Sequence, residues 1–201
     1  MIQQKKIKAI IFDFGGVFTY EGQLQRFFDH CHKKYGKTMD AISEESRDIW
    51  DKARIGKAPA HLYWDLLQKH FGADGKKLLE ECIIIDSFRE DTYEFVKGLK
   101  AKYRLGMITN QLQDWFEIVA EKYNIRQLFD EIVTSYESGL AKPDKAIFEF
   151  TLKKMGLEPS ECVFVDDMEK NIKAAEGVGM KGVLFQDTEQ LKSDLKKLGI
   201  E

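Results

Sequence analysis

Short apolar runs, separated by stretches with helical spacing, constrain the fold of this chain most strongly. The runs scarcely alternate with polar residues, as expected for strands that are buried on both faces of a sheet. They cover residues 7–12, 105–108, 132–134, 162–165 and 182–185. Because helical stretches lie between the later runs, we expect an α/β fold with a Rossmann-like, doubly wound parallel sheet.

The interval between the first two runs is too long for a simple crossover. It holds about ninety residues, whereas a strand–helix–strand unit needs roughly thirty. Three amphipathic stripes lie within it, at residues 24–31, 62–71 and 78–83. We therefore expect a helical cap of residues 18–87, inserted into a core of residues 1–17 and 88–201.

Composition narrows the classes of partner. The chain has 201 residues and a net charge of -3, which argues against nucleic acid or an anionic membrane as the main partner. The sequence contains no run of eighteen apolar residues, so it predicts no membrane-spanning helix. Cys31, Cys82 and Cys162 are odd in number and widely spaced, which favours a reducing, cytoplasmic location. Oligomeric state leaves no mark on the sequence.

Polar residues stand where the apolar runs end. Asp13 follows the first run, Thr109 and Asn110 follow the second, and Asp166 and Asp167 follow the fourth. The carboxyl ends of parallel strands meet at one edge of a sheet, where ligands bind. Three carboxylates gathered there would be costly without a cation or a ligand to compensate them, which favours a functional site.

The order of these residues resembles the four motifs of the haloacid dehalogenase-like superfamily. The matching segments are residues 10–17 (IIFDFGGV), 108–110 (ITN), 142–143 (KP) and 163–167 (VFVDD), with Asn171 beyond the last. Residues 138–144 (SGLAKPD) are typical of the branch with a helical cap, which includes phosphatases and the N-terminal domains of epoxide hydrolases. The resemblance implies a hydrolase with the core and cap described above.

The resemblance also implies a nucleophile and a metal site. Asp13 would attack phosphorus and form an aspartyl-phosphate that water then hydrolyses. Mg²⁺ would bind the Asp13 carboxylate, the Gly15 backbone carbonyl and Asp167, with Asp166 nearby or bridged by water. The substrate expected from this pattern is a small phosphorylated metabolite, such as a sugar phosphate.

Four further residues have implied supporting roles. Thr109 and Asn110 would donate hydrogen bonds to phosphoryl oxygens, and Lys142 would offset the charge of the phosphate and the nucleophile as a catalytic and substrate-binding group. Asn171 would steady the acidic loop. Among the cap aromatics Trp50, Tyr63 and Trp64, most are expected in the cap core, with one candidate for substrate contact.

Gly15 departs from the phosphatase pattern, because most phosphatases of this superfamily have a second Asp there as general acid and base. Water, His32, His61 or an easily departing leaving group could compensate. Three functions therefore stay open. Phosphomonoester hydrolysis leads; the alternatives are dehalogenation of a 2-haloacid by the same Asp13, and a non-catalytic module that binds phosphate or a partner.

Overall fold

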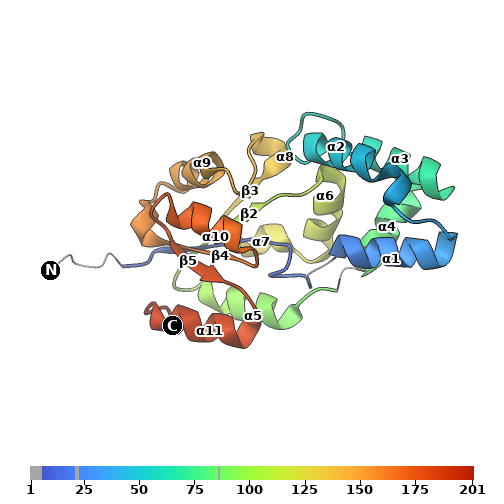
Figure 1. The fold of residues 1–201 in the computed structure, drawn as a ribbon. Coiled ribbons are helices and arrows are strands. Elements are labelled where there is room, and N and C mark those ends of the chain that lie inside the picture. Colours follow the sequence, from blue (N-terminus) through green and yellow to red (C-terminus); the bar gives the residue numbers. More distant parts are fainter. Residues whose placement is uncertain (1–5, 21–22, 86) are drawn as a thin grey trace.

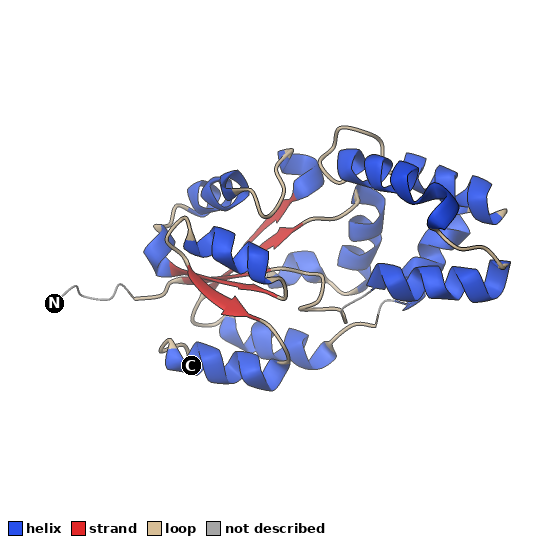
Figure 2. Ribbon diagram, in the orientation of Figure 1, coloured by secondary structure: helices blue, strands red, loops and turns tan. Residues whose placement is uncertain are grey.

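A five-stranded parallel sheet organises the computed structural model, which describes residues 6–20, 23–85 and 87–201 (Figures 1 and 2). The strand order is β3-β2-β1-β4-β5, so the chain builds outward from β1 first on one side and then on the other. The strands are β1 (Ala9–Phe12), β2 (Arg104–Thr109), β3 (Glu131–Thr134), β4 (Cys162–Asp166) and β5 (Lys181–Leu184). The predicted doubly wound parallel sheet is confirmed, with strand ends shifted by one or two residues.

Helices cover both faces of the sheet. Successive strand residues point to opposite faces, and both sets are apolar in the central strands. Ala9 and Ile11 of β1 belong to the apolar cluster of α9 and α10, whereas Ile10 and Phe12 belong to the cluster on the other face. Figure 1 shows α9 and α10 on one side and α5 and α11 on the other. The flanking helices are α5 (Glu90–Leu99), α6 (Gln113–Lys122), α7 (Ile125–Leu128), α8 (Ser135–Ser138), α9 (Lys145–Met155), α10 (Glu169–Glu176) and α11 (Thr188–Lys197).

Four helices between β1 and α5 form an insert beside the carboxyl ends of the strands (Figure 1). They are α1 (Gln23–Tyr35), α2 (Ser43–Ala53), α3 (His61–Phe71) and α4 (Gly75–Ile85). The three predicted stripes lie on α1, α3 and α4, although Leu62 of the second stripe is exposed. The sequence did not predict α2, because the residues that it buries, Ser46 and Ala53, are small and form no apolar stripe.

The two segments that connect the insert to the core pair with each other. Thr19 and Phe88 form an antiparallel bridge, and the Arg89 N–H donates to the Phe18 carbonyl oxygen at 2.7 Å. The Phe88 ring stacks on Tyr123 of the core, with centroids 3.9 Å apart. The two connections between the insert and the core therefore lie side by side, next to the loop that follows β1.

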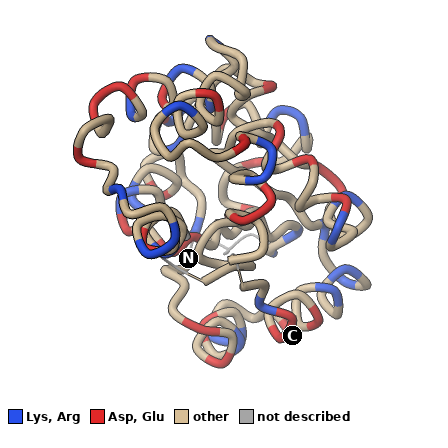
Figure 3. Tube along the Cα trace, turned by 90° about the vertical axis from the view of Figure 1, so that its right-hand side faces the viewer, with Lys and Arg blue, Asp and Glu red and all other residues tan. Residues whose placement is uncertain are grey.

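Charged residues of both signs are spread over the helices (Figure 3). None of the helices in the described part of the chain is long and apolar enough to cross a membrane. Two short 3₁₀ helices, Asp40–Ile42 and Pro159–Glu161, complete the elements.

Candidate active site

The sheet register brings the polar strand ends together. Phe12 is level with Met107 of β2 and Val165 of β4, so Asp13 lies beside the end of each neighbouring strand. The Asp13 N–H also donates to the Val165 carbonyl oxygen at 2.8 Å. Because β1 is central, the loops after β1, β2 and β4 converge at the point where the strand order reverses, which is where open α/β sheets bind ligands.

A buried lysine links two of the carboxylates. Lys142 Nζ lies 2.7 Å from Asp13 Oδ1 and 2.7 Å from Asp166 Oδ2, and all three residues are at most 8% exposed. Burial alone would lower the pKa of Lys142, but the Asp13 and Asp166 carboxylates outweigh it and raise that pKa. Lys142 is therefore a permanent cation at the centre of the site.

Asn110 holds the backbone of Lys142. Its Nδ2 donates to the Lys142 carbonyl oxygen at 2.9 Å, and its Oδ1 accepts from the Lys142 N–H at 3.0 Å. The sequence did not predict this reciprocal pair, which links the end of β2 to the lysine loop. An amide nitrogen has two protons, so the predicted hydrogen bond from Asn110 to a phosphoryl oxygen stays a prediction.

The acidic loop after β4 is held by its own neighbours. Asp166 accepts hydrogen bonds from Asn171 Nδ2, at 2.9 and 3.0 Å, and from the Met168 N–H at 2.8 Å. Asn171 thus steadies this loop, as the sequence predicted. Asp167 is not the N-cap of α10, since that position is Met168.

Three carboxylates at this edge fit a divalent cation. Oxygen atoms of Asp13, Asp166 and Asp167 all lie within 4.8 Å of one another. Burial raises the pKa of Asp13 from 3.8 to about 8, and the neighbouring carboxylates add to this rise, whereas Lys142 lowers that pKa without reversing the shift. One ammonium thus does not balance three carboxylates. Hard oxygen donors with an unbalanced negative charge are the set that Mg²⁺ prefers.

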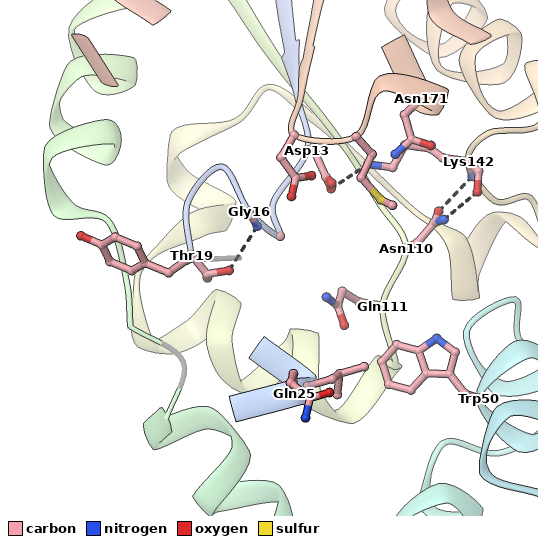
Figure 4. Close-up of a pocket in the computed structure, with 14 residues that line it drawn as sticks. Asp13, Gly16, Thr19, Gln25, Trp50, Asn110, Gln111, Lys142 and Asn171 are labelled. Carbon is pink, nitrogen blue, oxygen red and sulfur yellow. Dashed lines mark hydrogen bonds and ion pairs between the residues drawn. The ribbon is translucent and has the colours of Figure 1, made fainter. Parts of the chain in front are cut away.

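A cavity of about 330 Å³ opens over these groups (Figure 4). Asp13, Gly15, Asn110, Lys142 and Asp167 line it. Thr109 does not: its hydroxyl is buried at the end of β2, without a hydrogen-bond partner among the described residues. Several lining residues were missed by the sequence analysis: Thr19, Tyr20, Leu24, Gln25, Gln111 and Met168. Of these residues, only Gln111 and Met168 could have been predicted from the sequence, because each directly follows a matched motif.

A model of the haloacid dehalogenase-like hydrolases matches residues 7–179 of the sequence, which includes every residue of this cluster. The chain belongs to this family. The resemblance found in the motifs is thereby confirmed, and the chain is a hydrolase of the haloacid dehalogenase-like type.

Relatives of this hydrolase include proteins named for phosphatase activity. It is 26% identical to glyceraldehyde 3-phosphate phosphatase of Methanopyrus kandleri, over 94% of this chain and 90% of the relative. Flavin mononucleotide hydrolase 1 of Arabidopsis thaliana is 29% identical over 67% of this chain. A relative with another kind of name, drimenol cyclase drtB of Aspergillus calidoustus, is 26% identical over 96% of this chain. The chain spans 57% and 36% of the length of these last two proteins.

Solved structures show the same fold. A haloacid dehalogenase family enzyme from Bacteroides thetaiotaomicron, in a magnesium complex, superposes with a TM-score of 0.76 at 23% identity. The match covers 94% of this chain and 99% of the other.

No histidine of the described chain lines the cavity of this hydrolase. His61 is 68% exposed beside Asp65, and His32 is exposed near the end of α1, so neither cap histidine stands in for the acid missing at Gly15. Trp50 does line the cavity, whereas Tyr63 and Trp64 are buried in the insert. A Cβ atom at Gly15 would lie 3.9 Å from Gln111 Nε2, which leaves room for a side chain.

Gly16→Ala should displace Asp167. Gly16 has a φ of +74°, and an added Cβ would lie 2.0 Å from Asp167 Oδ2. We expect a loss of about 1–3 kcal/mol in stability from the strained backbone and a further loss of Mg²⁺ affinity. Gly36→Ala is the control, because its φ is +71° and nothing lies within 4 Å of the added Cβ. Thermal unfolding with and without Mg²⁺ measures both effects, and equal Mg²⁺ stabilisation of the two variants would contradict this role of Gly16.

Proposed function

We propose that the protein is a magnesium-dependent phosphatase that hydrolyses a small phosphorylated metabolite through an aspartyl-phosphate on Asp13. The observation that carries this proposal is the buried arrangement of Lys142 between Asp13 and Asp166, with a third carboxylate beside them. Relatives named glyceraldehyde 3-phosphate phosphatase and flavin mononucleotide hydrolase support it. The cytoplasmic location stays a prediction.

The nucleophile is oriented by two donors. Asp13 Oδ1 accepts from the Phe14 N–H at 2.6 Å and from Lys142, which leaves Oδ2 for the attack. In the first step Oδ2 forms a bond to phosphorus, and the bond from phosphorus to the ester oxygen breaks with its electron pair. The departing alkoxide takes a proton from water, because Gly15 has none to give. Water then attacks phosphorus and gives a proton to the hydroxide left by the first step, while the bond from phosphorus to Oδ2 breaks with its electron pair on Oδ2, so that phosphate is released and the Asp13 carboxylate is regenerated.

The phosphoryl oxygens need donors that offset their charge. Lys142 supplies a cation, and the Thr109 hydroxyl is buried without a partner in the described structure, so it suits a phosphoryl oxygen that reaches it. Asn110 adds the second proton of its amide.

Asp13, the Gly15 carbonyl and Asp167 would hold Mg²⁺, with Asp166 adjacent. When bound, the ion neutralises the carboxylates and the phosphoryl group as two anions approach each other. The magnesium complex of the Bacteroides thetaiotaomicron enzyme, which has the same fold, supports this assignment.

The insert would act as a cap of residues 18–87 over a core of residues 1–17 and 88–201. Leu24, Gln25 and Trp50 of the insert line the cavity, and Gln25 and Trp50 lie on the side opposite Asp13 (Figure 4). Such a cover excludes bulk water and favours a small substrate, such as a sugar phosphate, over a macromolecule.

Removal of the metal tests this proposal. Phosphate release from a panel of small phosphomonoesters should disappear in excess chelator and return with Mg²⁺, and Asp167→Asn should need at least about tenfold more Mg²⁺ for half-maximal rate. Release of halide from 2-chloropropionate in the presence of chelator would instead establish dehalogenation. A folded protein that binds phosphate and turns over neither substrate would be a non-catalytic module.

Gly15→Asp should restore the missing acid. The φ of Gly15 is not positive and no atom crowds its added Cβ, so the backbone tolerates the change. A general acid is worth roughly 10²–10⁴ in rate, and it helps an alkyl ester more than an aryl ester, whose leaving group departs without protonation. The ratio of alkyl to aryl phosphate turnover should therefore rise at least about tenfold. Gly98→Asp, on α5 with open space around its Cβ, is the control. An unchanged ratio in folded Gly15→Asp would contradict the missing-acid explanation.

A further inference from the structure

The cavity is charged at one end and uncharged at the other. Its charged lining side chains, Asp13, Lys142 and Asp167, all belong to the phosphoryl end. Across the cavity lie the uncharged side chains of Gln25 and Trp50 from the insert (Figure 4). Together with Leu24 of the insert and Gln111 of the core, which also line the cavity, they form what we call the leaving-group chamber. A substrate phosphorylated on Asp13 would place its alcohol in this chamber.

The apolar wall of the chamber is supported by packed aromatic rings. Trp50 packs edge to face on Tyr63 at 5.3 Å, and Tyr63 packs on Trp64 at 5.3 Å. A narrow space of about 10 Å³ behind Trp50 is lined by further uncharged residues, including Cys82 and Trp115. This wall offers apolar area and ring faces to a leaving group.

The polar groups of the chamber are amides, which offer dipoles and no charge. Gln111 is fixed through its backbone, whose N–H donates to Ser135 Oγ at 3.2 Å. Gln25 Nε2 donates to Asp29 Oδ1 at 2.9 Å, so the charge nearest to this amide in its own helix is negative. Both amides suit neutral hydroxyl or carbonyl groups.

Two arginines donate hydrogen bonds to the backbone carbonyl oxygens of cavity-lining residues. Arg26 donates to the Tyr20 carbonyl oxygen at 3.0 Å, and Arg89 donates to the Thr19 carbonyl oxygen at 3.4 Å. Neither lines the cavity, where Lys142 is the sole cation among the described residues. Lys142 is already engaged by two carboxylates.

A second anion on the substrate would therefore lose part of its hydration against Leu24 and Trp50 without gaining a counterion, and loss of hydration without a partner disfavours a charged group. We infer that the site accepts phosphomonoesters of uncharged, partly apolar alcohols and discriminates against bisphosphates and phosphorylated carboxylic acids. This inference rests on the proposed phosphatase function, since it assigns the leaving group of that reaction.

Matched substrates test the inference. Phenyl phosphate and 4-carboxyphenyl phosphate share a ring and differ in one carboxylate, and glycerol 3-phosphate and 3-phosphoglycerate form an alkyl pair. We expect kcat/KM with Mg²⁺ to favour the uncharged member of each pair by about tenfold or more.

A cation placed in the chamber should reduce the preference for the uncharged substrate of each pair. Gln25→Arg is combined with Asp29→Asn, because the Asp29 carboxylate would otherwise pair with the new arginine. The control combines Asp29→Asn with Ile84→Arg on α4, where Ile84 is 75% exposed and does not line the cavity. Both double variants have the same net charge. The Gln25→Arg double variant should reduce the preference for uncharged substrates by at least about fivefold. The Ile84→Arg double variant should keep the preference of the wild type.

The outcomes separate the inference from the proposed function. Equal or faster turnover of the charged members, dependent on Asp13 and Mg²⁺, would overturn the inference and leave the phosphatase proposal intact. A preference that the Gln25→Arg double variant does not narrow would also overturn it, because charge would not be its cause. If the folded, Mg²⁺-binding protein hydrolyses no phosphomonoester, both proposals fail.

Discussion

Asp13→Asn should reduce phosphatase turnover by roughly 10⁴-fold or more, since loss of a nucleophile removes the covalent pathway altogether. The amide nitrogen of Asn is not nucleophilic toward phosphorus in the way that a carboxylate oxygen is. The amide oxygen, however, can still accept from the Phe14 N–H and from Lys142, as Asp13 Oδ1 does. The fold should therefore survive the substitution.

The measurement is phosphate release in the presence of Mg²⁺, together with thermal unfolding in chelator. Asp65→Asn is the matched control, because Asp65 on α3 is 62% exposed and does not line the cavity, and it should keep wild-type turnover. The proposed nucleophile would be wrong if Asp13→Asn were folded and lost less than about tenfold of the rate, which is the scale of a merely supporting contact.

The sheet was predictable because its signal is local. The apolar runs match strands that are buried on both faces, and the register then forces Asp13 and Asp166 to lie side by side. Motif order likewise indicated Lys142, which lies between α8 and α9 and whose ammonium contacts both carboxylates. The distances from Lys142 to Asp13 and Asp166 depend on the tertiary fold. The sequence alone could predict them only through the resemblance to the family.

The far wall of the cavity was not predictable, because it depends on how the insert packs on the core. Leu24 and Gln25 are ordinary residues of an amphipathic helix, and nothing in their spacing places them at the cavity. The conformation of Gly15 was also open. The sequence could not tell which of two adjacent glycines has a positive φ, and the structure assigns it to Gly16, which packs against Asp167.

Lys142→Met should destabilise the protein as well as inactivate it. The substitution removes the cation that contacts Asp13 and Asp166 at 2.7 Å and leaves two buried carboxylates without it. Removing one partner of a buried ion pair costs about 3–5 kcal/mol, which for a chain of this length lowers Tm by roughly 6–20 °C. Lys192→Met is the control, because Lys192 is partly exposed, pairs with the exposed Glu189 and lies 5.6 Å from the centre of the Phe95 ring. The Tm of this variant should change by less than about 3 °C.

The pH dependence of the Tm of Lys142→Met shows whether the variant is destabilised by the loss of a compensating charge or by poor packing. The pKa of Asp13 is raised from 3.8 to about 8, so this group destabilises the fold as pH rises through that window, where the unfolded chain releases a proton that the folded chain retains. Lys142 lowers the pKa of Asp13, so its removal should raise that pKa further and extend the destabilisation to higher pH. In chelator, the Tm deficit of Lys142→Met relative to wild type should therefore be larger at pH 9 than at pH 6, because only the folded wild type releases the Asp13 proton between these values. A deficit that is equal at both pH values would show that the methionine packs poorly, and that charge compensation by Lys142 contributes little to stability.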